Sequence, residues 1–368
     1  MKIIINATQY KKNSSGIGVL SKWLFSCFTK ISNHECTVIL LEDSPQFQSK
    51  PGTKQIRLPY KKGQNIRRIL FLLFKMGHKF CKNSVFLTTD SKIPILLPNS
   101  CKIIPIITDL AIYKLRGAYQ FSRVILWKLQ YFFLKKRSNK FIAISECTKR
   151  DLIEVMQIEE EKIDIVYCAA DPAVTRNYDE SIRNKYGLPN NYILYVGNLN
   201  PRKNLHRLIL AFDKLKKETD LPHKLVIVGD IGWKFNFQKI MHSLESKNDI
   251  LLKGFISDTE ISSVYSMADV FAFPSLYEGF GIPILEAQQC GTPVLTSNCS
   301  AMPEVGGKGA HYVDPYDINE IYGGLKKILM DCEYADYLVQ EGYKNAMKFS
   351  WEKSAEKLSK IVESVIEK

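Results

Sequence analysis

The sequence lacks several features that would define a class of protein. Its nine cysteines are an odd number, scattered without a CxxC pair and without the His/Cys spacing of a zinc site. No apolar run reaches the roughly 18 residues of a spanning helix, and the N-terminal stretch MKIIINATQYKKNSSG has no signal-peptide pattern. We therefore expect a cytoplasmic protein from a reducing compartment.

Acidic residues are scarce in the first half only. Residues 1–172 hold 28 Lys and Arg against 13 Asp and Glu, whereas residues 173–368 hold 23 against 25. The first half is therefore expected to face an anionic partner, which is a membrane surface, a nucleic acid or a phosphorylated acceptor. Because no RNA-reading or helix-turn-helix pattern accompanies the charge, we favour the membrane and predict no nucleic-acid partner.

Two segments of the first half mix basic residues with large apolar ones. They are residues 66–81, IRRILFLLFKMGHKFC, and residues 121–140, FSRVILWKLQYFFLKKRSNK. Aromatic, Lys and Arg side chains suit the headgroup depth of an anionic membrane interface. For the first segment, a core helix with a solvated basic side is an equal alternative.

Short buried strands alternate with helical segments along the whole chain, and 368 residues suffice for two cores. Strands are predicted at 2–6, 37–41, 85–88, 103–107, 141–144, 192–196, 224–229, 249–254, 270–273, 293–296 and 310–314. This α/β pattern predicts an N-terminal domain over residues 1–172 and a C-terminal domain over residues 180–350. We expect the hinge at about 170–185.

The most informative stretch is ADVFAFPSLYEGFGIPILEAQQCGTPVLTS, residues 268–297. A strand leads into the loop EGFG, and a helix follows. The first turn of a helix has unpaired N–H groups and the positive end of the dipole, so the loop suits an anion. Glu278 and Glu286 bracket it, and carboxylates accept from sugar hydroxyls rather than from phosphate. We predict a nucleotide-sugar site, with an ordinary strand-to-helix turn as the alternative.

A second loop of the same half carries two cations. The strand at 192–196 leads into GNLNPRKN, in which Arg202 and Lys203 stand just before a helix. Cations at a helix start are unfavourable unless an anion neutralises them, so the pair is typical of a diphosphate clamp. A solvated pair on a loop is the alternative.

Together, PRKN, EGFG and the second glutamate resemble the motifs of the retaining glycosyltransferases of family 4, in which E-x7-E is a signature. The resemblance implies the GT-B fold, in which two Rossmann-like α/β domains face each other across a cleft and the C-terminal helix (351–368) crosses back to the N-terminal domain. It implies hexose transfer from a nucleotide diphosphate sugar. No DxD-type motif follows a strand, so neither a metal nor another cofactor is expected.

The same resemblance implies partners and roles. The PRKN form is similar to that of mannosyltransferases of capsule and O-antigen assembly, which implies GDP-mannose as donor and a lipid-linked or surface glycan as acceptor at the inner face of the membrane. Glu278 would hold hydroxyls of the donor sugar and Glu286 the ribose, while Lys203 and Arg202 would stabilise the diphosphate. Further donor contacts are expected from Gly16, Phe255, Gly279, Phe280, Gly281 and Ile282.

The chain departs from the family pattern in its first half. Where the family often has HD, this chain has Thr108 and Asp109, so Asp109 is predicted either to orient the loop or the acceptor or to cap a helix. Ser145, at another strand-to-helix turn, either caps the helix or touches substrate. Because Thr108 replaces the histidine, a noncatalytic nucleotide-sugar-binding or membrane-associated protein of the same fold is the alternative function.

Overall fold

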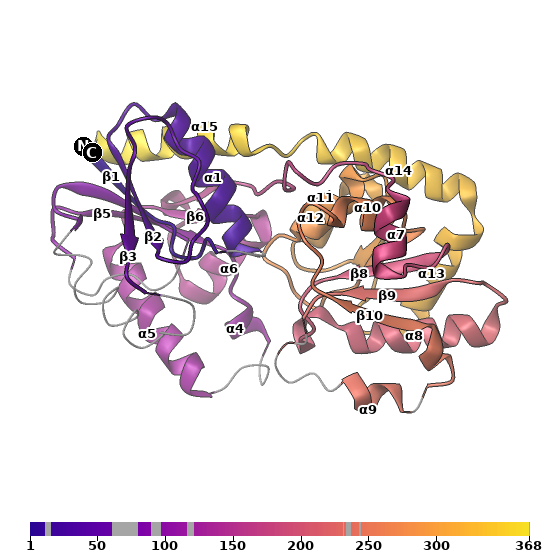
Figure 1. Ribbon diagram of the computed structural model, residues 1–368. Coiled ribbons are helices and arrows are strands. Elements are labelled where there is room, and N and C mark those ends of the chain that lie inside the picture. The colour runs from indigo at the N-terminus through magenta and orange to yellow at the C-terminus, as the bar shows by residue number, and fades with distance from the viewer. Residues whose placement is uncertain are drawn as a thin grey trace. The chain divides into compact units, whose positions relative to one another are not determined.

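The computed structural model describes residues 1–11, 16–60, 80–89, 97–115, 121–230, 232, 237–242 and 244–367. The chain divides into two compact units. Unit 1 comprises Met1–Cys168 and Phe349–Lys368, and unit 2 comprises Ala169–Lys348. Each unit has one parallel sheet with helices packed on it (Figure 1). The basic amphipathic segment predicted at 66–81 lies outside the described residues, apart from its last two.

Unit 1 is built on a sheet of seven strands. In spatial order they are β3 (Lys54–Leu58), β2 (Cys36–Leu41), β1 (Lys2–Asn6), β4 (Ser84–Thr88), β5 (Lys102–Ile107), β6 (Phe141–Ala143) and β7 (Ile163–Ile165). The central strands are buried on both faces, which explains their unbroken apolar sequences. The two edge strands escaped prediction, because β3 is mostly polar and exposed and β7 is only three residues long.

The last helix of the chain belongs to unit 1. The described helices of this unit are α1 (Ile17–Ile31), α4 (Ala111–Lys114), α5 (Phe121–Arg137), α6 (Glu146–Met156) and α15 (Trp351–Ile366). Helix α15 packs against α1 and buries Trp351 and Leu358. Lys102 Nζ donates to the Val365 carbonyl at 2.7 Å, at the negative end of α15. The predicted return of the C-terminal helix to the first domain is confirmed.

Unit 2 repeats the strand order of unit 1 in a sheet of six. The strands are β10 (Ile250–Gly254), β9 (Lys224–Val228), β8 (Tyr192–Val196), β11 (Val270–Phe273), β12 (Val294–Ser297) and β13 (Ala310–Val313). The helices are α7 (Glu180–Tyr186), α8 (Leu205–Glu218), α9 (Phe237–Met241), α10 (Ile261–Ser266), α11 (Ile282–Gln289), α12 (Met302–Gly306), α13 (Ile318–Met330) and α14 (Cys332–Ala346). All predicted strands of this half are present, with small differences at their ends.

The strand order of unit 2 contains a switch point. Strand β8 pairs with β9 on one side and with β11 on the other, so the chain reverses its direction of travel across the sheet at β8. Open α/β sheets bind ligands outside the carboxyl ends of the strands at such a switch point. The loops after β8 and β11 are the two that carry PRKN and EGFG.

We expect the packing of α15 to contribute strongly to the stability of unit 1. Leu358 is fully buried, so Leu358→Ala should lower the free energy of unfolding by about 2–5 kcal/mol. Denaturant unfolding followed by tryptophan fluorescence measures this, because three of the four tryptophans lie in unit 1. Lys357→Ala, an exposed neighbour, is the control. Equal stabilities of the two variants would contradict the assignment of α15 to this core.

Candidate active site

Hydrogen bonds join the two loops at the switch point into one structure. The backbone N–H of Leu276, in the loop after β11, donates to the carbonyl of Arg202, in the loop after β8, at 2.8 Å. Asn204 Nδ2 donates to the carbonyls of Pro274 at 2.9 Å and Pro315 at 2.6 Å. The cations of the first loop are therefore held in fixed register against the second loop.

The two asparagines of NPRKN shape the turn between them. Asn200 Oδ1 accepts from the N–H of Arg202 at 3.1 Å and so caps the short turn Pro201–Lys203. Asn204 is buried and has a φ of 57°, a left-handed conformation that asparagine adopts more readily than most residues. Our sequence interpretation assigned roles only to the two cations and missed Asn204, whose function depends on contacts with distant carbonyls.

The side chains of both cations converge on Glu278. Lys203 Nζ lies 2.8 Å from Glu278 Oε1, and Arg202 Nη2 lies 3.8 Å from Oε2. Lys203 Nζ also lies 4.5 Å from the centre of the Phe273 ring. Burial alone would raise the pKa of Glu278, but the charges of Arg202 and Lys203 outweigh burial, and the pKa is lowered. Glu278 is thus a buried carboxylate held ionised by two cations.

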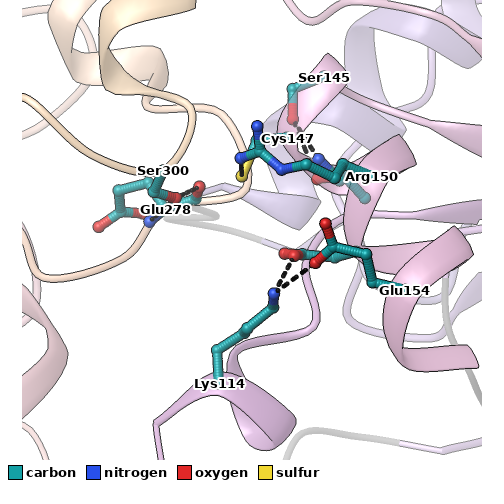
Figure 2. Close-up of polar contacts among 9 residues, drawn as sticks. Lys114, Ser145, Cys147, Arg150, Glu154, Glu278 and Ser300 are labelled. Carbon is teal, nitrogen blue, oxygen red and sulfur yellow. Dashed lines mark hydrogen bonds and ion pairs between the residues drawn. The ribbon is translucent and has the colours of Figure 1, made fainter.

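Ser300, in the turn after β12, fixes the backbone of Glu278. Its hydroxyl accepts from the N–H of Glu278 at 3.0 Å and donates to the carbonyl of the same residue (Figure 2). Ser300 has a φ of 59°, which is uncommon for serine. No sequence motif pointed to Ser300, because a sequence does not show a residue's backbone conformation. Nor does it show that the turn after β12 contacts the loop after β11.

Tyr195 is a third residue that the sequence interpretation missed. It is fully buried in β8, and its hydroxyl has no hydrogen-bond partner among the described residues. Its oxygen lies 3.4 Å from the position that a Cβ atom would take at Gly197, where the loop with the two cations begins. Burial raises the pKa of Tyr195, so the group stays a neutral donor.

Glu286 has the opposite electrostatic environment to Glu278. It lies half-buried on α11, and the Tyr265 hydroxyl donates to Oε2 at 3.1 Å. Burial, and more weakly the carboxylates of Asp171 and Asp258, raise the pKa of Glu286 to about 7 in spite of that hydrogen bond. Between the two glutamates, Gly281 has a φ of 107° and starts the helix at Ile282. Phe280 and Ile282 are buried, which fixes this loop.

The other predicted residues lie at further strand ends. Phe255 follows β10 and is 43% exposed, so its ring does not pack in the core. In unit 1, Gly16 has a φ of 55° before α1, and an added Cβ would meet no atom within 4 Å. Asp109 Oδ1 accepts from the N–H of Ala111 at 3.0 Å, at the start of α4. Its predicted role toward an acceptor stays a prediction.

Ser145 has the capping role that was one of its two predicted roles. It is the N-cap of α6 and accepts from the N–H of Thr148 at 3.0 Å. In a separate polar group of unit 1, Lys114 Nζ lies 2.7 Å from Asp151 Oδ1 and 3.3 Å from Glu154 Oε2 (Figure 2). Lys114 of α4 is thus paired with two carboxylates of α6.

The described residues contain neither a metal-binding cluster nor a membrane-spanning helix. No group of three or more His, Cys, Asp or Glu side chains in the described ranges is arranged to hold a metal ion. Within the same ranges, no helix has the length and apolar character needed to cross a membrane.

Known proteins resemble this chain in sequence. Residues 179–345 match the family described as Glycosyl transferases group 1. O-antigen chain mannosyltransferase B of Escherichia coli is 35% identical over 162 residues, which are 44% of this chain and 42% of that protein. O-antigen chain mannosyltransferase RfbU of Salmonella typhimurium is 25% identical over 342 residues, covering 89% of this chain and 90% of the relative.

A solved structure shows the fold. HepE of Anabaena, crystallised with UDP-glucose, has a TM-score of 0.76 and 16% identity, covering 99% of this chain and 100% of HepE. The predicted GT-B fold is confirmed. The chain spans less than half the length of the first curated relative and less than a third of the serotype-specific mannosyltransferases WbdA of Escherichia coli that it also matches.

We expect the Lys203–Glu278 pair to be strongly coupled. Lys203→Met removes the nearest counter-charge of a buried carboxylate and should lower the free energy of unfolding by about 3–5 kcal/mol at neutral pH. Adding Glu278→Gln should recover most of this loss. A double-mutant cycle by urea unfolding measures the coupling. Because the pKa of Glu278 is lowered in the native pair, the deficit of Lys203→Met should shrink in acid, where the carboxylate gains a proton. Simple additivity would contradict the pairing.

We expect Glu286 to make stability depend on pH near neutrality. Its raised pKa, about 7, means that the ionised form is disfavoured by folding, so stability falls as pH rises from the unfolded pKa through 7. The melting temperature of Glu286→Gln, relative to that of wild type, should therefore increase as the pH rises from about 5 to about 8. Glu333→Gln, an exposed glutamate on α14, is the control. A difference that does not vary with pH would disprove the shift.

Proposed function

The chain belongs to the glycosyl transferases group 1 family through residues 179–345, and we propose that it is a retaining glycosyltransferase that moves a hexose from a nucleotide diphosphate sugar to a glycan. The observation that carries the proposal is the cluster of Arg202, Lys203 and Glu278 at the switch point of the sheet. Two fixed cations beside an ionised carboxylate match a donor that has a diphosphate next to sugar hydroxyls.

Each part of the cluster has a distinct task in this proposal. Charge develops on the leaving diphosphate as its bond to the anomeric carbon breaks, and Lys203 and Arg202 stabilise that charge. Glu278, held by Ser300, accepts hydrogen bonds from hydroxyls of the donor sugar. The acceptor hydroxyl forms the new bond on the face from which the diphosphate departs, so configuration is retained, and its proton leaves with the diphosphate.

The ribose and the loop backbone complete the proposed donor site. Glu286 would accept from ribose hydroxyls, for which its ionised form is the better acceptor. The backbone around Gly281 and α11 would face sugar and phosphate. The donor contact predicted for Gly16 stays a prediction. Phe255, exposed at the end of β10, would contact the base. No metal is required in this scheme, because the cations are side chains.

GDP-mannose is the proposed donor, and a lipid-linked or surface glycan is the proposed acceptor. The named relatives that support this are O-antigen chain mannosyltransferases. A UDP-sugar is the second candidate, supported by the fold that the chain shares with HepE, which was crystallised with UDP-glucose. The excess of cations in residues 1–172 supports an enzyme that works at an anionic inner membrane surface.

A thermal-shift and hydrolysis screen against GDP-, UDP- and dTDP-sugars, with and without chelator, tests the donor site. One nucleotide sugar should raise the melting temperature of wild type whether or not chelator is present. The Lys203→Met/Glu278→Gln double variant, which is expected to fold, should bind it at least about tenfold more weakly because a charged hydrogen bond is lost. Lys214→Met/Glu218→Gln, which removes an ion pair of α8 and likewise leaves the net charge unchanged, is the charge-matched control.

Three outcomes decide between the candidate functions. If no nucleotide sugar shifts the melting temperature, or if the double variant responds as wild type does, the donor site is wrong. A shift that requires metal would disprove metal independence. Tight binding without hydrolysis or transfer would support the noncatalytic alternative instead.

A further inference from the structure

Helix α5 has a second apolar face that the core does not cover. Ile125, Leu126, Leu129, Phe132 and Phe133 are each between 40% and 53% exposed. At about 100° per residue they lie within an arc of about 120°. The opposite side of the helix faces the core of unit 1, where Tyr131 and Leu134 are buried and Trp127 packs against them. Packing on one side thus leaves a continuous apolar strip on the other.

This strip is unusual for the protein. No other described helix exposes more than two large hydrophobic side chains, and those of α1, Ile17 and Ile31, stand at opposite ends of the helix. Single exposed apolar residues are normal on soluble proteins, whereas contiguous ones mark an interaction surface. We call these five residues of α5 the α5 face.

Cations border the α5 face, and acids are absent from the helix. Its sequence, FSRVILWKLQYFFLKKR, contains no Asp or Glu. Lys136 Nζ lies 4.4 Å from the centre of the Phe132 ring, and Phe132 contacts Phe133 edge to face at 6.0 Å. Arg137 instead anchors the helix end through the carbonyls of Leu97 and Pro98. Lys128, Lys135 and Lys136 therefore supply the charge around the strip.

We propose that the α5 face inserts into the interfacial region of an anionic membrane, with the three lysines at headgroup depth. Aromatic and aliphatic side chains beside lysines suit the boundary between headgroups and acyl chains, where a helix lies in the plane of the membrane. The excess of cations over acids in residues 1–172 complements such a surface. The inference deepens the proposed function by naming the element that meets the membrane, but the membrane contact is testable without donor or acceptor.

Vesicle flotation of the full chain tests the insertion. Wild type should float with phosphatidylcholine vesicles that contain about one third phosphatidylglycerol, and much less with pure phosphatidylcholine, at about 0.1 M salt. Leu129→Ser/Phe132→Ser should weaken binding at least about tenfold, because two large apolar groups are lost from the inserted strip. Met330→Ser/Tyr337→Ser, exposed on α13 and α14 of unit 2, is the matched control and should bind as wild type does.

Two further measurements separate insertion from simple attraction. Brominated lipids in anionic vesicles should quench the fluorescence of a Leu129→Trp variant more than that of wild type. Such added quenching requires that the new tryptophan contacts the acyl chains. Lys128→Gln/Lys135→Gln/Lys136→Gln should lose the preference for anionic lipid. Nucleotide-sugar binding by all α5 variants should match wild type, so failure of the donor site and failure of the membrane contact are distinguishable.

Any of three results would overturn the proposal. Wild type could fail to float, the α5 and control variants could float equally, or brominated lipid could add no quenching of the Leu129→Trp variant. A concentration-dependent dimer in sedimentation that only the α5 variants dissociate would show that a second copy of the chain covers the face instead.

Discussion

The structure of unit 2 depends on a buried carboxylate that two cations from a neighbouring loop keep ionised. Glu278 is buried by the fold that creates the site, and without counter-charges that burial would force it to take up a proton. Lys203 and Arg202 supply those charges, and Asn204 holds their loop against the one that carries Glu278. Because each loop stabilises the other, the site is preorganised, and a diphosphate would meet cations that are already in place.

The two glutamates of the E-x7-E signature have pKa values shifted in opposite directions, although both lie close to the start of α11. The cations beside Glu278 lower its pKa, whereas burial, and more weakly the carboxylates of Asp171 and Asp258, raise the pKa of Glu286 to about 7. The sequence spacing alone treats them as a pair. The environments separate their roles, since only a carboxylate that stays ionised is a constant acceptor for hydroxyls, while the other responds to pH and to what binds beside it.

The sequence predicted those strands and site residues that depend on a local residue pattern. Buried strands such as β8 and β11 are continuous apolar runs, and the resemblance of PRKN and EGFG to family motifs assigned Lys203 and Glu278 to one donor. The structure pairs these two side chains. The sequence interpretation missed what depends on tertiary contacts. Ser300 acts through a left-handed backbone beside a distant loop, and Tyr195 is indistinguishable in sequence from its apolar neighbours in β8. Edge strand β3 was missed because exposure removed its apolar signal.

In helix α5 the apolar pattern of the sequence is present, but it fits more than one orientation of the helix. Its sequence is apolar on more than one side, so periodicity cannot say which side packs on the sheet. The structure resolves this, because Tyr131 and Leu134 fill the core and the strip with Leu129 and Phe132 is left in solvent. An exposed strip of that size is costly in water, and the lysines around it would be costly in a protein core. An anionic membrane interface accommodates both the apolar strip and the lysines. The arrangement therefore favours a lipid surface over another protein.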